Sequence, residues 1–142
     1  MCGSTRFISF KRDPFLTRCL SCKGNITNLS LIPVIKEHVK DDYSKSAYEL
    51  SSYGSTYDFL ARHFTNTTAS EYMPDEKLGE RINGIFNQDV QHLTFSDASF
   101  DVVTSNQVFE HVPDDIKGYA ECLRVLGKWL RILTGCKYRL LF

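Results

Sequence analysis

The chain has 142 residues, and its 17 Lys and Arg balance its 17 Asp and Glu, so the formal net charge is zero. That length is enough for one domain with a hydrophobic core, and a composition of 42% hydrophobic and 24% charged residues excludes a disordered tail or a fibrous repeat. The lack of a basic surplus argues against nucleic acid as a partner, because binding to a phosphate backbone normally requires one.

The sequence also lacks membrane and export signals. No apolar run is long enough to cross a bilayer, and residues 1–6 have no charged start followed by an apolar region. The five cysteines are odd in number and come without a secretory signal, so reduced thiols are expected. We therefore predict a cytoplasmic protein without a membrane partner.

The N-terminal residues 1–42 are irregular in sequence. Breakers such as Asp13-Pro14 and Ile32-Pro33 interrupt apolar runs that are themselves short. We interpret residues 1–42 as a loop-rich lead-in and residues 43–142 as the main domain.

Strand and helix patterns alternate regularly in the main domain. Short apolar or β-branched runs predict strands over 47–50, 67–72 and 99–105, and a further strand that ends near Asp89. Between the first two strands, helical spacing relates Tyr57, Leu60, Ala61 and Phe64.

A second helix is predicted after Pro113, where acidic residues favour a first helical turn. One apolar stripe along it is formed by Ile116, Tyr119, Ala120 and Leu123. Strands that alternate with helices indicate an α/β fold, with a mostly parallel sheet and helices on its faces.

Acidic residues close three of the predicted strands. Glu49 ends the first, Glu71 the second and Asp89 the third. Ligands of an open parallel sheet bind outside the carboxyl ends of the strands, where an acid can accept hydrogen bonds from ribose hydroxyls. The turn after Glu49 contains Ser51 and Gly54, small residues that let backbone N–H groups approach a ligand. From this pattern alone, two explanations are equally good: the acids are merely exposed to solvent at strand ends, or they belong to a nucleoside-binding site.

Three linked stretches carry a resemblance to a known family. They are Asn87-Gln88-Asp89-Val90, residues 99–114 with the sequence Ser-Phe-Asp-Val-Val-Thr-Ser-Asn-Gln-Val-Phe-Glu-His-Val-Pro-Asp, and Arg124-Val125-Leu126. In this order they resemble a class I S-adenosylmethionine-dependent methyltransferase of the type 11-like group, over roughly residues 48–126. The resemblance implies a Rossmann-like sheet, S-adenosylmethionine as cofactor, and methyl transfer to an acceptor that the sequence does not identify.

For the first two strand ends, the resemblance implies a loop on the nucleotide side of the cofactor and a contact with the ribose. Glu49, Ser51 and Gly54 would belong to the cofactor-binding loop, where the family has a glycine-rich turn. Glu71 would accept hydrogen bonds from the ribose hydroxyls.

For the later strand ends, the resemblance implies contacts with the rest of the cofactor. Asp89 and Val90 would lie near the adenine, and Asn106 would face the methionine end of the cofactor or the substrate. His111 is a candidate general base for a hydroxyl or amine acceptor, with a loop-shaping role as the alternative.

After Leu126 the sequence departs from the family, which continues with a Pro-Gly-Gly-like turn and further strands. Here Gly-Lys-Trp-Leu-Arg follows at 127–131, so we expect a C-terminally truncated chain with an incomplete sheet and one more candidate strand at 138–142. This favours a second function, a non-catalytic remnant that binds cofactor weakly or acts through protein contacts. A nicotinamide-dependent oxidoreductase, the third hypothesis, would require Gly-x-Gly-x-x-Gly after the first strand.

The N-terminal cysteines raise the question of a metal. Cys19-x-x-Cys22, with Cys2 upstream, resembles half of a zinc ribbon. A structural zinc site needs four ligands, and this set is incomplete. We therefore expect no bound metal, and zinc on Cys2, Cys19 and Cys22 is the alternative.

Overall fold

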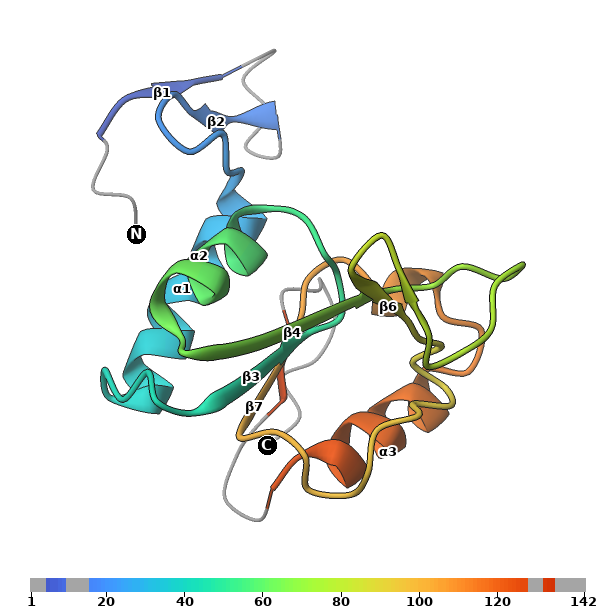
Figure 1. The fold of residues 1–142 in the computed structure, drawn as a ribbon. Helices are drawn as coiled ribbons and strands as arrows, with labels where there is room; N and C mark the ends of the chain where they lie inside the picture. The colour runs from blue at the N-terminus through green and yellow to red at the C-terminus, as the bar shows by residue number, and fades with distance from the viewer. Residues whose placement is uncertain (1–4, 10–15, 128–131, 135–142) are drawn as a thin grey trace.

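The computed structural model describes residues 5–9, 16–127 and 132–134 (Figure 1). A small hairpin comes first, followed by helices and strands that alternate along the chain. In order, the elements are β1 (Phe7–Ile8), β2 (Arg18–Cys19), α1 (Ile26–Val39), β3 (Ser46–Glu49), α2 (Ser55–His63), β4 (Asn66–Glu71), β5 (Arg81–Ile82), β6 (Ile85–Asn87), β7 (Val102–Ser105), the 3-10 helix η2 (Phe109–His111), α3 (Asp115–Val125) and β8 (Ile132–Thr134).

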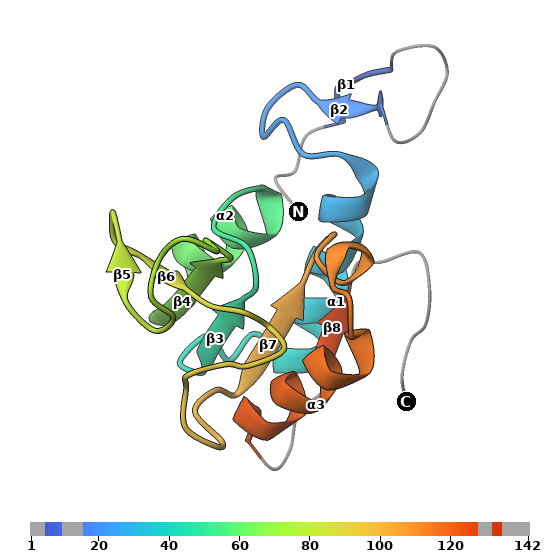
Figure 2. The ribbon, with the colours of Figure 1, turned by 90° about the vertical axis from the view of Figure 1, so that its right-hand side faces the viewer.

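The strands β3 to β8 form one sheet in the order β5-β6-β4-β3-β7-β8 (Figure 2). Neighbouring strands are parallel, except for the antiparallel pair of β5 and β6. The order reverses at β3, whose Tyr48 lies opposite Thr68 of β4 and Val103 of β7. These findings confirm the predicted Rossmann-like α/β fold with a mostly parallel sheet.

Alternate residues of the central strands face two separate cores. Ala47 and Val102 pack with α1 and α2, whereas Tyr48 and Val103 pack with α3. In Figure 1, α1 and α2 accordingly lie on one side of the strands and α3 on the other. Burial of each large apolar side chain stabilises the fold by about 1.5–3 kcal/mol, so the strand ends are held firmly from both faces.

Residues 26–39 form a helix, which corrects the interpretation of residues 1–42 as loop-rich. Leu31, Ile35 and Val39 recur every four residues and are buried against α2 and β3. Pro33 predicts an interruption, because proline removes a helical hydrogen bond, but the burial of this face outweighs that loss. Helix α1 shares a core with the sheet, and the division between 1–42 and 43–142 stays a prediction.

Helix α3 begins where the sequence predicts, but it buries a different face. Ile116 and Leu123 of the predicted apolar stripe are 78% and 60% exposed, so the stripe is not the buried side. The residues of α3 that are buried are Gly118, Cys122 and Val125. A Cβ atom at Gly118 would lie 2.9 Å from the Phe109 ring, so the absence of a side chain allows this face to approach η2 closely.

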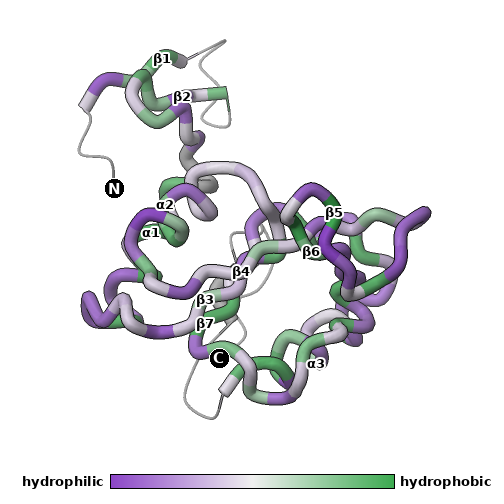
Figure 3. The backbone as a smooth tube through the Cα atoms, viewed as in Figure 1, coloured by the Kyte–Doolittle hydropathy of each residue, from purple (hydrophilic) through white to green (hydrophobic). Residues whose placement is uncertain are grey.

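Strand β8 pairs with β7 and extends the sheet beyond the strands predicted from the sequence. The candidate strand at 138–142 lies outside the described residues. Hydrophilic residues gather in the loop between β4 and β5 (Figure 3). Within 5–9, 16–127 and 132–134, every helix is too short or too polar to cross a membrane.

Candidate functional site

A cavity of about 370 Å³ opens at the carboxyl ends of β3, β4, β6 and β7. Its volume is within the usual range for small-ligand sites, about 300–1,000 Å³. Glu49 and Gly54 are absent from its wall, although both were predicted site residues. The other six predicted site residues line it: Ser51, Glu71, Asp89, Val90, Asn106 and His111.

Glu71 ends β4 and is held by the turn that follows β3. Its Oε1 accepts hydrogen bonds from the Ser52 backbone N–H at 2.6 Å, the Ser52 hydroxyl at 2.9 Å and the Ser51 hydroxyl at 3.2 Å. The side chain is half-buried and lines the cavity. The parallel pairing of β3 with β4 brings this acid and this turn together.

Glu49 ends β3, and its side chain lies inside the protein. It is 1% exposed, and the Thr104 hydroxyl donates a hydrogen bond to its Oε2. The other oxygen, Oε1, is buried and has no hydrogen-bond partner among the described residues. Burial raises the pKa of Glu49 to about 8, against the lowering effect of the Thr104 hydrogen bond, so the neutral acid is favoured at pH 7. The Glu49 side chain is therefore part of the protein interior and does not reach the cavity wall.

The segment after β6 forms a tight turn around Asp89. Its Oδ1 accepts hydrogen bonds from the Gln91 backbone N–H at 2.8 Å and from Gln91 Nε2 at 3.1 Å. Gln88, which is buried, donates to the Thr94 hydroxyl at 2.7 Å and accepts from the Thr94 backbone N–H at 2.9 Å. These bonds fix the turn that presents Asp89 and Val90 to the cavity.

Asn106 and His111 come from the segment after β7. The Asn106 amide donates to the Thr56 hydroxyl of α2 at 3.0 Å. Its Oδ1 is buried and has no partner in the part of the chain that the structure describes. Since an unsatisfied buried oxygen costs free energy, this atom favours a ligand that brings a donor. His111 ends η2 and is exposed at the cavity wall.

The turn after β3 ends at Gly54, whose φ of 95° favours glycine. The cavity wall also contains side chains that were not predicted as site residues from the sequence, among them Tyr53, Tyr72, Gln88 and Gln91. Tyr53 and Tyr72 are 76% and 62% exposed. The sequence contained one signal that Tyr72 lies at the site, because this residue directly follows Glu71, a predicted ligand contact.

The cysteines give no support for zinc. Among the described residues, no group of three or more His, Cys, Asp or Glu could hold a metal ion. Cys19 is buried in β2, Cys22 is partly buried in the turn that follows, and Cys2 lies outside the described residues. The expectation that the chain binds no metal stays a prediction. Cys122, in contrast, is a buried core residue of α3.

A parallel sheet of this order, with a cavity at its carboxyl ends, defines a Rossmann-like protein of the kind that binds nucleotide cofactors. A sequence profile described as a methyltransferase domain matches residues 49–128, which is more than half of the chain. The chain therefore belongs to this family of S-adenosylmethionine-dependent methyltransferases, as the resemblance predicted.

Solved structures share the fold. The YcgJ protein from Bacillus subtilis has a TM-score of 0.58 and 20% identity, over 75% of this chain and 49% of that one. A candidate methyltransferase from Bacillus halodurans has a TM-score of 0.55 and 16% identity, over 71% and 46%. A candidate sarcosine dimethylglycine methyltransferase from Galdieria sulphuraria has a TM-score of 0.53 and 22% identity, over 71% and 43%. The chain thus spans about half the length of these structures, and no curated protein matches it.

Proposed function

We propose that this chain binds S-adenosylmethionine in the cavity and transfers its methyl group to an acceptor. One observation carries the proposal: Glu71, Asp89 and Asn106, which belong to the ends of three different strands, meet at one cavity of a methyltransferase domain. Convergence of polar groups at the carboxyl ends of a parallel sheet is the usual arrangement of a nucleotide site.

The polar groups of the cavity fit this cofactor. The Glu71 carboxylate is an acceptor for the ribose, and the Asp89 carboxylate is an acceptor for the exocyclic amine of adenine. The buried Oδ1 of Asn106 lacks a donor within the described residues, and the ammonium group at the methionine end supplies one. We assign Ser51 and Val90 to the walls that enclose these groups.

Methyl transfer places modest demands on the side chains. When bound, the cofactor supplies a methyl group on a positively charged sulfur, which an acceptor atom can attack directly. The residues of the chain therefore have to hold and align the reactants and exclude water, without forming a covalent bond. We assign His111 the task of taking the proton from a hydroxyl or amine acceptor.

Binding without methyl transfer is a second candidate function. It is favoured by the turn after β3, where Ser51 and Ser52 already occupy one oxygen of Glu71. In that case the chain would bind cofactor weakly or act through contacts with another protein. Incubation with methyl-labelled S-adenosylmethionine and a pool of small-molecule acceptors separates the two functions, because only an enzyme moves the label.

The binding site is tested by calorimetric titration with S-adenosylhomocysteine. We expect saturable binding to the wild-type chain, and a loss of affinity of about 10- to 100-fold for Glu71→Ala and for Asp89→Ala, because each removes a charged hydrogen-bond acceptor. Asp75→Ala is the matched control, since Asp75 is an exposed carboxylate outside the cavity. Equal affinity of all four proteins would contradict the assigned site.

A further inference from the structure

Charge is unevenly distributed along the sequence. Residues 1–36 contain six Lys and Arg but one acid, Asp13, and residues 37–142 carry the balancing acidic excess. The net charge of zero therefore averages two unlike parts, and it does not exclude a local surface that binds anions. A charge asymmetry of this kind is typical of proteins that contact nucleic acid or a membrane surface.

The β1–β2 hairpin carries two arginines and two aliphatic side chains on one face. Ile8 lies opposite Arg18 in the antiparallel register, and one pair further along the Leu20 backbone N–H donates to the Arg6 carbonyl at 3.0 Å. Residues opposite each other share a face of a two-stranded sheet, and so do alternate residues along one strand. We call the surface formed by Arg6, Ile8, Arg18 and Leu20 the hairpin face.

The hairpin face is accessible to a partner. Ile8 and Leu20 are 42% and 46% exposed, Arg6 is exposed and Arg18 is half-buried. Residues 5–9 and 16–25 contain no Asp or Glu, and Lys23 adds a third cation in the turn after β2. The partner that fits this face is an anion that also has surface able to pack on aliphatic side chains.

The alternation of arginine with aliphatic side chains favours nucleic acid over a lipid or a protein. A bilayer or the core of a protein interface requires a contiguous apolar patch, but on the hairpin face each aliphatic side chain neighbours an arginine both across and along the strands. Guanidinium groups pair with phosphates and stack on bases, and aliphatic side chains can pack on the sugars and bases between the phosphates.

The hairpin stands beside the cavity. Gly24, which follows the hairpin, lies so close to α2 that a Cβ atom there would be 2.3 Å from Ser55 Oγ. Ser55 directly follows the turn 51–54, which contributes Ser51 and Tyr53 to the cavity wall. Figure 2 shows the hairpin on the side to which the strand β7 points, the edge at which the cavity opens. A nucleic acid strand on the hairpin face can therefore bring a neighbouring nucleotide to the cavity.

We propose that the hairpin face binds single-stranded nucleic acid, and that the methyl acceptor is an oxygen or nitrogen atom of a nucleotide in that strand. The inference rests on the proposed function and names its substrate class. A single strand is required because an atom of a stacked, paired base cannot enter the cavity. In the transfer, the acceptor atom forms a bond with the methyl carbon while the bond from this carbon to sulfur breaks, and His111 takes the proton that the acceptor loses.

Binding is measured by the fluorescence anisotropy of a labelled 12-nucleotide RNA, and of the DNA of the same sequence, titrated with the full chain. At 50 mM salt we expect saturable binding with a dissociation constant of about 1–100 µM, weakened about 7-fold at 200 mM salt, as two arginine–phosphate contacts predict. Arg6→Gln/Arg18→Gln should bind about 10-fold more weakly and lose most of this salt dependence. Arg6→Gln alone, at an exposed position outside the strands, should bind about 3-fold more weakly.

Lys77→Gln/Arg81→Gln is the matched control, because it removes the same charge in and near β5, at the far edge of the sheet. It should bind within about 2-fold of the wild type. A similar loss in the control and in Arg6→Gln/Arg18→Gln would overturn the inference. Sedimentation of the chain with phosphatidylserine vesicles, without binding to either strand, would also overturn it.

The acceptor is tested by incubation of total RNA and denatured DNA with methyl-labelled S-adenosylmethionine. We expect label in one of the two polymers, reduced about 10-fold for Arg6→Gln/Arg18→Gln, which should still bind S-adenosylhomocysteine as the wild type does. A chain that binds S-adenosylhomocysteine but neither binds nor labels nucleic acid would overturn the inference and leave the proposed function intact. A folded chain that binds nucleic acid but not S-adenosylhomocysteine would contradict the proposed function.

Discussion

Replacing Glu49 by Gln is expected to stabilise the protein by roughly 3–5 kcal/mol above pH 8 and to remove most of the pH dependence of stability between pH 5 and 8. Burial raises the pKa of Glu49 from 4.5 to about 8 in the folded chain. The folded state therefore holds a proton that the unfolded chain releases. The stability from this proton is complete below about pH 4.5 and is lost as the pH rises through 8.

Gln is a suitable replacement because its carbonyl can still accept the hydrogen bond from Thr104, while its amide does not titrate. Urea unfolding at half-unit pH steps gives the free energy for each protein. Glu80→Gln is the control, since Glu80 is exposed and pairs with Lys77 on the surface, and it should follow the wild type closely. Parallel pH curves for the wild type and Glu49→Gln would contradict a buried, protonated Glu49.

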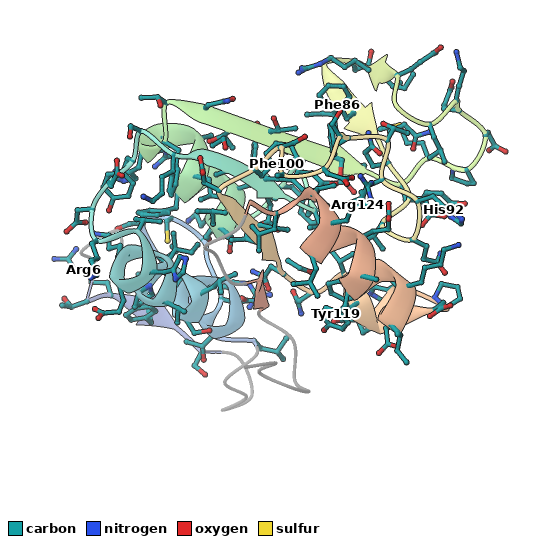
Figure 4. All side chains as sticks on the ribbon, turned by 90° about the horizontal axis from the view of Figure 1, so that it is seen from below. Arg6, Phe86, His92, Phe100, Tyr119 and Arg124 are labelled. Carbon is teal, nitrogen blue, oxygen red and sulfur yellow. The ribbon has the colours of Figure 1, made fainter. Side chains whose placement is uncertain are left out.

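Replacing Arg124 by Ala is expected to lower the free energy of unfolding by about 2–4 kcal/mol, because several hydrogen bonds are lost together. The guanidinium donates to the carbonyls of Leu93 and Phe95 at 2.7 and 2.8 Å. It also donates to both carboxylate oxygens of Glu121 and to Asp97, each at 2.8 Å. Figure 4 shows Arg124 where α3 meets the loop that carries His92. Without the guanidinium, the loop between β6 and β7 loses its main attachment to α3.

Arg124→Lys should recover less than half of that loss, because a single ammonium group cannot reach two carbonyls and two carboxylates at once, as the planar guanidinium does. Arg62→Ala serves as the comparison, since Arg62 is exposed on α2. Chemical denaturation measures all three variants. If Arg124→Lys matched the wild type, charge alone would explain the contact and the hydrogen-bond account would be wrong.

Much of the fold follows from local pattern. The predicted strands at 47–50, 67–72 and 99–105 overlap β3, β4 and β7, since β-branched and apolar runs bounded by polar residues specify buried strands. Helix α1 was missed because Pro33 is a strong local helix breaker. The helix is stabilised by a hydrophobic core that it forms with residues distant in the sequence, which a local pattern does not reveal. The buried face of α3 was also missed, because Gly118 carries no apolar side chain and yet lies against the Phe109 ring.

The site was predictable where it depends on topology. Parallel strands end at the same edge, so the acids Glu71 and Asp89 could be assigned to one site from the strand ends, whereas Asn106 was assigned to it by the family resemblance. Glu49 ends its strand in the same way, but its side chain turns into the core toward Thr104. Only the three-dimensional packing shows that Glu71 lines the cavity and Glu49 does not. The contact of Ser51 and Ser52 with Glu71 likewise depends on the pairing of β3 with β4.

Hydrogen exchange with and without S-adenosylhomocysteine shows whether the cavity at the strand ends holds the cofactor. We expect slower exchange of backbone amides at Ser52, Val90 and Gln107, which lie in the segments that follow β3, β6 and β7. Amides of the β1–β2 hairpin should be unchanged. Protection confined to the hairpin, or no protection at a saturating concentration, would contradict the account.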